Sequence, residues 1–239
     1  MKSLAISLVV VSALAGCVSA SNDADSNTVD SAASTTTVVS AGIAGTVGRF
    51  TADVWADNWF SLYVNGEKVG EDPVPITTER SFNSETISFE AVYPFTVGVL
   101  VKDFVENASG LEYIGTDRQQ MGDGGLMIQI TDEASGRVVA VSNGTWKALV
   151  TAEAPLNPEC EKSLDPMNEC KSRNVVEPDG WAFATFDDSS WANATTFRAD
   201  EVGPKDGYND ILWDSSAKFV WGPNLKTDNI VLVRTSVSG

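Results

Sequence analysis

The residue types that can do chemistry are unevenly represented in this sequence, and histidine is missing altogether. The 239 residues include 33 Asp and Glu, 16 Lys and Arg, 7 Trp and 3 Cys. Without His, the chain lacks the usual general base of Ser and Cys nucleophiles and the commonest zinc ligand. Enzymes that use two carboxylates as acid and base remain possible. No pair of acids is marked by a motif, and we therefore expect no catalytic activity.

The acidic residues set limits on the partners of the chain. A formal net charge of −17 argues against nucleic acids and anionic lipid headgroups, because both would be repelled. Carboxylates can also supply calcium ligands. The loop 200–214 is rich in them, but its spacing does not match the EF-hand pattern. A calcium site in this loop and a solvated acidic surface are both open interpretations of Glu201, Asp206, Asn209, Asp210 and Asp214.

The N-terminus has the pattern of an export signal. Lys2 precedes an apolar run, 4–14, that is shorter than the roughly 20 residues a membrane-spanning helix needs. Leu14-Ala15-Gly16-Cys17 resembles the bacterial lipobox, in which the Cys receives fatty-acyl (palmitate) chains and becomes the new N-terminus. We expect a signal peptide at 1–17 and a protein anchored by lipid in the membrane of the bacterial envelope. The alternative is cleavage after Val18-Ser19-Ala20, which would give a secreted protein.

The other two cysteines remain as a pair. Export brings the chain into an oxidising compartment, so a disulfide between Cys160 and Cys170 is expected. The surrounding segment, near 155–178, is polar and interrupted by Pro, which indicates a surface insert closed by this bridge. No C-x-x-C spacing is present, and we therefore interpret the bridge as structural.

The remaining chain divides into a tether and one domain. Residues 18–47 are rich in Ser, Thr, Asp, Ala and Val and lack aromatic residues, a composition typical of a disordered tether. Residues 48–239 match the size of one β-sandwich. Asn65-Gly66 between two β-prone runs predicts a hairpin. The other predicted strands are 85–92, 95–104, 125–131, 137–142, 146–151, 182–186, 218–221 and 230–237.

Several of these segments together resemble the galactose-binding-like domains that accompany glycoside hydrolases such as rhamnosidases and β-galactosidases. The resemblance implies an all-β jelly-roll sandwich and, in some members, a structural calcium held largely by backbone carbonyls. The cysteine-closed insert departs from the family pattern. The segments that carry the resemblance are 51–53 with 56–66, 124–130 with 143–147, Phe-Asp-Asp-Ser-Ser-Trp at 186–191, and 217–221 with 231–234.

Within these segments most polar and aromatic residues have a structural interpretation. Asp187 to Ser190 suit a tight turn, and Trp146, Trp191 and Trp221 lie in matched segments and suit the core. Trp residues near loop signals can instead stack on the apolar face of a sugar. The candidate ligand-binding residues are therefore Trp55, Trp181 and Trp213, together with Asp57, which precedes a strand in a matched segment.

Two functions follow from these observations. The first is a non-catalytic, lectin-like carbohydrate-binding or adhesive module at the cell surface, with a glycan or polysaccharide as partner. The alternative is a structural or protein-interaction lipoprotein of the envelope that binds no sugar, since a fold alone does not determine function.

Overall fold

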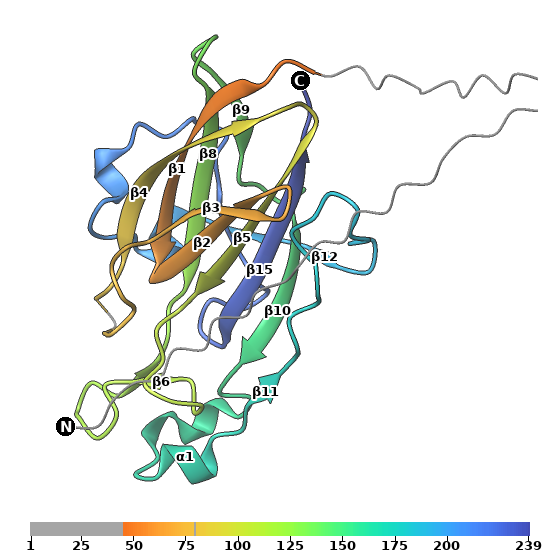
Figure 1. Cartoon of the computed structure of the whole chain (residues 1–239). Coiled ribbons are helices and arrows are strands. Elements are labelled where there is room, and N and C mark those ends of the chain that lie inside the picture. The colour runs from red at the N-terminus through yellow and green to blue at the C-terminus, as the bar shows by residue number, and fades with distance from the viewer. Residues whose placement is uncertain (1–44, 79) are drawn as a thin grey trace, which may run out of the picture. The chain divides into compact units, whose positions relative to one another are not determined.

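The structure is a computed structural model that describes residues 45–78 and 80–239, and these residues form an all-β fold (Figure 1). The predicted signal peptide, Cys17 and all but the last residues of the predicted tether lie outside the described residues. None of the helices in the described part is long and apolar enough to cross a membrane. The helical elements are η1 (Pro158–Lys162), α1 (Pro166–Glu169), α2 (Ala199–Val202) and η2 (Tyr208–Asp210). The strands are β1 (Gly48–Asp57), β2 (Trp59–Val64), β3 (Glu67–Glu71), β4 (Asn83–Ala91), β5 (Phe95–Lys102), β6 (Leu111–Glu112), β7 (Gln120–Met121), β8 (Gly125–Asp132), β9 (Arg137–Val141), β10 (Lys147–Glu153), β11 (Arg173–Asn174), β12 (Ala192–Asn193), β13 (Thr195–Phe197), β14 (Phe219–Trp221) and β15 (Asp228–Val237).

Two antiparallel sheets form the fold, and a short β6–β7 pair lies apart from them. The first sheet has six strands in the order β13-β14-β8-β1-β4, with β9 also paired to β8. The second sheet has seven strands in the order β11-β10-β15-β5-β2-β3, with β12 also paired to β10. The C-terminal strand β15 therefore lies at the centre of the second sheet, where it pairs with β5 along the whole length of β5.

The core lies between the two sheets. Side chains alternate between the faces of a strand, so Phe50, Val54 and Ile128 of the first sheet face Val99 and Val233 of the second sheet in one apolar cluster. Burial of these aliphatic and aromatic side chains is the main favourable term for the fold.

Aromatic clusters also cover the outer face of each sheet. On the first sheet, Trp55 and Phe219 pack under Tyr208, which belongs to the segment 198–218. On the second sheet, Trp181 and Trp191 from the segment 178–191 pack over Leu232. Both sheets are thus buried on two sides.

The predicted hairpin is confirmed. Asn65 and Gly66 connect β2 and β3 with φ angles of 51° and 90°. A type I′ turn needs positive φ at both positions, and Asn and Gly tolerate it best. The side-chain Oδ1 of Asn65 also accepts a hydrogen bond from the Thr96 N–H at 2.9 Å, which holds the turn against β5.

One predicted strand is absent from the structure, and one long strand was not predicted. The segment 182–186 forms turns, because the carbonyls of Phe183 and Phe186 accept hydrogen bonds from the Arg234 guanidinium and no ladder forms. Strand β1 was not among the predicted strands, although Phe50, Ala52, Val54 and Ala56 alternate inward along it. Two of those inward residues are Ala, whose small side chains weaken the pattern.

The predicted disulfide is present and closes the insert. Cys160 and Cys170 are bonded, with their Cα atoms 5.4 Å apart, and Cys160 is buried. The bridge joins η1 to the end of α1, and β11 then returns the chain to the edge of β10. Figure 1 shows this insert at one end of the sandwich.

Candidate functional site

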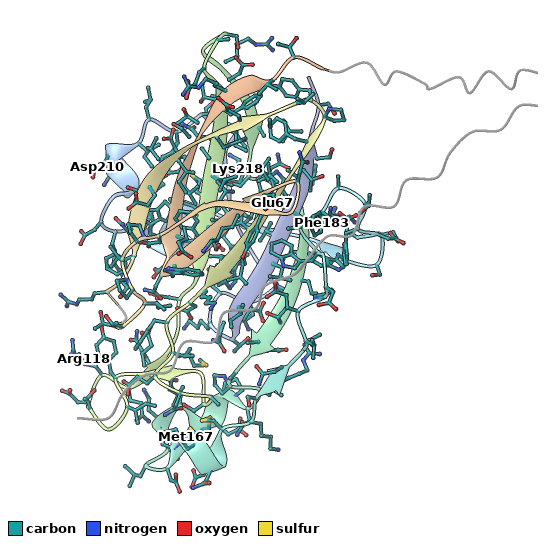
Figure 2. All side chains as sticks on the ribbon, in the orientation of Figure 1. Glu67, Arg118, Met167, Phe183, Asp210 and Lys218 are labelled. Atoms are coloured by element: carbon teal, nitrogen blue, oxygen red, sulfur yellow. A yellow bond between two sulfur atoms is a disulfide. The ribbon has the colours of Figure 1, made fainter. Side chains whose placement is uncertain are left out.

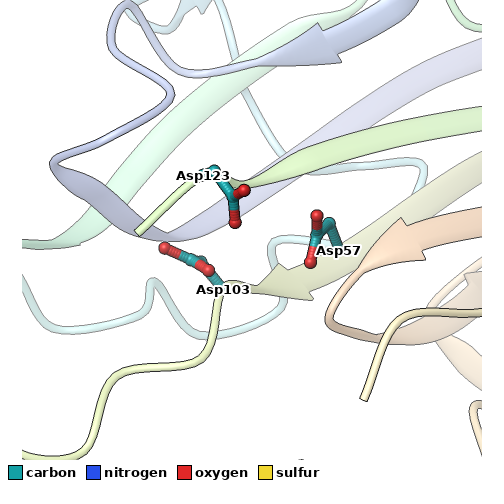
Figure 3. A group of neighbouring side chains, drawn as sticks. All are labelled: Asp57, Asp103 and Asp123. Atoms are coloured by element: carbon teal, nitrogen blue, oxygen red, sulfur yellow. The ribbon is translucent and has the colours of Figure 1, made fainter. Parts of the chain in front are cut away.

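Three carboxylates converge at one end of the sandwich, and we refer to Asp57, Asp103 and Asp123 as the acidic centre (Figure 3). Asp57 is the last residue of β1, Asp103 directly follows β5, and Asp123 lies two residues before β8. The centre therefore joins β1 and β8 of the first sheet to β5 of the second sheet.

Local structure explains why these side chains meet. In β5 the inward positions are Val97, Val99 and Val101, and the same alternation turns Asp103 inward at the end of the strand. Asn58, the residue after Asp57, holds the end of β1 close to Asp103. The Asn58 N–H donates to the Lys102 carbonyl at 2.8 Å, and its Oδ1 accepts from the Phe104 N–H at 2.5 Å.

Two glycines let the segment before β8 approach the other two acids. A Cβ atom at Gly122 would collide with Oδ2 of Asp103, and one at Gly124 would collide with the Trp221 ring. Residues with side chains at these positions would displace Asp123 from the centre. Glycine is therefore required here for close approach of the backbone.

Burial places the acidic centre under electrostatic stress. Asp57 is 1% exposed and Asp103 is 3% exposed, and no oxygen of either carboxylate lies in good hydrogen-bond geometry with a donor of the described residues, although the Asp123 backbone N–H partly stabilises the Asp103 carboxylate. Burial, followed by repulsion from Asp123 and Glu112, raises the pKa of Asp57 well above its usual value, and Lys205 opposes this rise. The pKa of Asp103 is raised well above its usual value by burial and then by repulsion from Asp57, Glu112 and Asp123. A cation would relieve this repulsion.

The geometry of the acidic centre fits a divalent cation. One carboxylate oxygen from each Asp lies within 4.8 Å of the others. Two oxygens that bind the same calcium at about 2.4 Å can be at most about 4.8 Å apart, so the spacing matches. Asp123 is the exposed member and pairs with Lys205 at 3.6 Å, with 39% of its side chain accessible. Solvent can therefore reach the centre from the Asp123 side.

A pocket of about 310 Å³ borders the acidic centre at Asp103, where β5 and β10 end and β15 begins. Its walls include the segment after β5 and residues 172–174 of the insert. The apolar part of the lining is formed by Ile76, Phe104, Val105, Ala152, Ala154 and Ile230. The polar part includes Lys102, Asn107, Glu153, Ser172 and Asn174. Small-ligand pockets span about 300–1,000 Å³ and combine apolar walls with a few polar groups, as this one does.

The predicted ligand residues do not form one exposed site, although Trp55 and Trp213 share the aromatic cluster on the first sheet through Tyr208. Trp55 is fully buried and donates from Nε1 to the Asp206 carbonyl at 3.0 Å, and Trp181 is 4% exposed. A stacking residue must show a ring face to solvent, so burial argues against the sugar-binding role expected for these two. Trp213 is half-buried, stacked on Tyr208, and keeps part of its ring accessible. Asp57 belongs to the acidic centre and is too deeply buried to touch a sugar directly.

The other structural interpretations agree with the structure. Trp146, Trp191 and Trp221 are 2%, 6% and 0% exposed. The Asp187 carboxylate caps the Ser189 N–H at 3.0 Å, as expected for a turn. In the loop 200–214 the acids do not converge, and the acidic centre is the one potential metal-ligand group of three in the described residues.

Asp103, Asp123 and the pocket residues were not predicted from the sequence. One signal was available for Asp103, because it continues the inward series of β5 as a charged residue in an apolar position. No ligand-binding motif singled out Asp123, which directly precedes the matched segment 124–130. Nothing in the sequence places β8 beside the end of β5.

Comparison of the chain with protein-family models, with curated proteins and with solved structures found no match.

Proposed function

We propose that this chain is a non-catalytic carbohydrate-binding module of the galactose-binding-like jelly-roll type, carried on the bacterial cell surface by a lipid anchor. The observation that carries the proposal is the pocket at the end of the second sheet, which combines apolar walls with both charged and amide side chains. The sequence motifs in chain order and the two packed antiparallel sheets support the fold assignment.

The pocket chemistry suits a sugar better than an ionic ligand. A sugar ring has apolar C–H faces and hydroxyls that both donate and accept hydrogen bonds. Phe104 and Ile230 can cover the ring faces, while Lys102 and Glu153 offer a donor and an acceptor at opposite charge. Glu153 also pairs with Arg173, so its carboxylate is held in place at the rim.

A glycan array with the purified chain, followed by calorimetry on the best sugar, tests this proposal. We expect Phe104→Ala and Lys102→Ala each to weaken binding by roughly tenfold, the effect of losing about 1.4 kcal/mol. Lys226→Ala is the matched control, because Lys226 is exposed and lies outside the pocket. Absence of binding to every glycan, or equal loss in the control, would contradict the proposal.

One observation favours the alternative of a protein-interaction lipoprotein. The insert exposes apolar side chains, among them Leu164, Met167 and Val176; Figure 2 shows Met167 on α1, at the end of the sandwich. Exposed apolar groups that cluster can mark a protein-binding surface. Cross-linking in intact envelopes would test it: a specific adduct that is lost in Leu164→Ser with Val176→Ser would favour this function over sugar binding.

A further inference from the structure

The acidic centre contains two carboxylates whose burial is unfavourable unless their charge is compensated. Asp57 and Asp103 are almost fully buried; the Asp57 carboxylate has no hydrogen-bond donor among the described residues, and that of Asp103 has only the Asp123 backbone N–H, outside good hydrogen-bond geometry. A buried charge without a partner is strongly destabilising. Figure 3 shows the three side chains pointing toward a common space from three different segments. Either protons or a cation must compensate the charge.

We propose that Asp57, Asp103 and Asp123 form a binding site for one divalent cation, with calcium as the preferred ion. The site consists of side-chain carboxylates from the ends of three strands, and one of them, Asp103, also lines the pocket, so cation binding is measured without sugar. Calcium prefers oxygen ligands, accepts irregular geometry and gives up water more readily than magnesium. A group of three carboxylates, two of them buried, with mutual spacing up to 4.8 Å provides such ligands.

The sequence around each ligand supports a built site. Asn58 anchors Asp57 through two backbone contacts with 102 and 104, and Gly122 leaves the space that the Asp103 carboxylate occupies. The accessible Asp123 provides the entry path. A cation held in this way would cross-link β1 and β8 of the first sheet to β5 of the second sheet. It would also fix the start of the segment 104–108, which forms one wall of the pocket.

Terbium luminescence provides a direct measurement on the full chain. The Trp221 ring lies against Gly124, next to Asp123, and can sensitise emission from a terbium ion at the acidic centre. We expect terbium emission that calcium displaces at one equivalent per chain. Calorimetry should show calcium binding below about 1 mM, the weak limit of protein calcium sites, with magnesium at least about tenfold weaker.

Thermal unfolding gives a second readout. With calcium at about 100 times its dissociation constant, the midpoint should rise by about 5–10 °C relative to the protein in EGTA. Asp57→Asn and Asp103→Asn should reduce calcium affinity by at least about 100-fold, because affinity depends on the number of charged ligands. In EGTA, the same variants should be as stable as the wild type or more stable, since each removes a buried charge.

Asp117→Asn is the matched control, because Asp117 is exposed in the same segment between β5 and β8 and lies outside the acidic centre. It should bind calcium like the wild type. Absence of saturable binding to the wild type in both assays would overturn the proposal, and protons would then compensate the centre. Calcium binding unchanged in both variants would also overturn it, and equal magnesium affinity would overturn the assignment to calcium. The wild-type measurements decide the question even if a variant does not fold.

Discussion

Arg234 shows how two of the sequence motifs depend on each other. It is 4% exposed, forms an ion pair with Asp188 and donates to the carbonyls of Phe183 and Phe186. Its guanidinium also lies over the Phe186 ring at 5.4 Å. The segment 183–188 is therefore held on the outer face of the second sheet by one side chain from β15.

Replacement of Asp188 by Asn should destabilise the fold measurably. The change keeps the shape of the side chain but leaves the buried guanidinium without its counter-charge, which costs about 1–3 kcal/mol. Chemical denaturation would measure the free energy of unfolding. The neighbouring Asp187→Asn is the control, since Asp187 is exposed and its replacement should change stability much less than that of Asp188. Equal effects of the two substitutions would contradict the role of the Arg234 pair.

The acidic centre predicts a pH dependence in the absence of cations. The pKa values of Asp57 and Asp103 are raised in the folded state by burial and by repulsion within the centre and from Glu112, with Lys205 opposing the rise at Asp57. Between about pH 4, where unfolded Asp ionises, and the raised values, the folded state binds more protons than the unfolded state. In EGTA, the stability that these two carboxyls contribute is therefore fully present at low pH and is lost as pH rises through this window.

Denaturation in EGTA at a series of pH values would check this direction. The double variant Asp57→Asn with Asp103→Asn should show a flatter profile than the wild type, because the titrating groups are gone. Other acids contribute to both profiles, so the difference between them is the quantity to compare. An identical slope for the two proteins would show that these carboxyls do not titrate as described.

At the scale of elements, the insert lies outside the apolar core between the sheets, which contains none of its residues. It pairs with the second sheet where β11 meets β10, at Asn174 and Arg173. It is also tied to the segment before β8, because Gln119 Nε2 donates to the carbonyls of Glu161 and Ser163 at 2.7 and 2.8 Å. The disulfide therefore acts at the end of the sandwich and not in its core.

Replacement of both Cys160 and Cys170 by Ser should lower the free energy of unfolding by about 2–3 kcal/mol, the chain-entropy value for a short closed loop. The sheets should stay folded, so the near-ultraviolet circular dichroism of the core Trp residues should be retained. The reference is the disulfide-bonded wild type, in which a thiol reagent under non-reducing conditions should find no free Cys at these two positions. Loss of the whole fold, or free thiols at both positions in the wild type, would contradict the prediction.

At the scale of the whole molecule, the net charge of −17 bears on the proposed lipid anchor. Anionic lipid headgroups would repel such a charge, so we expect membrane attachment to come from acyl chains and not from the surface of the domain. Stable attachment needs more than one acyl chain, which lipidation of Cys17 would provide.

Cys17→Ala should prevent lipid attachment. We expect the wild-type protein to begin at an acylated Cys17 and to partition into the detergent phase, and the variant to partition into the aqueous phase. Mass spectrometry of the mature N-terminus would identify the product. A wild-type protein that begins at Ser21 without lipid would show that cleavage follows Ala20 and that the protein is secreted.

Local features of the fold could be predicted from the sequence alone. The Asn65-Gly66 turn depends only on which residues tolerate positive φ, and the Cys160–Cys170 bond was predicted from the expected export and from the lack of another Cys in the domain. Alternation of apolar residues indicated most long strands, because the inward face of a sandwich strand is determined by its own sequence.

The burial of the aromatic residues and the meeting of the acids were decided only by the tertiary structure. Trp55 and Trp181 are buried because the segments 198–218 and 178–191 fold back over the outer faces of the sheets, which no local pattern specifies. Asp103 and Asp123 meet because the ends of β5 and β8 come together when the two sheets pack. Sheet packing is a long-range event driven by burial of the whole apolar interface, so its consequences for single side chains are absent from their local sequence.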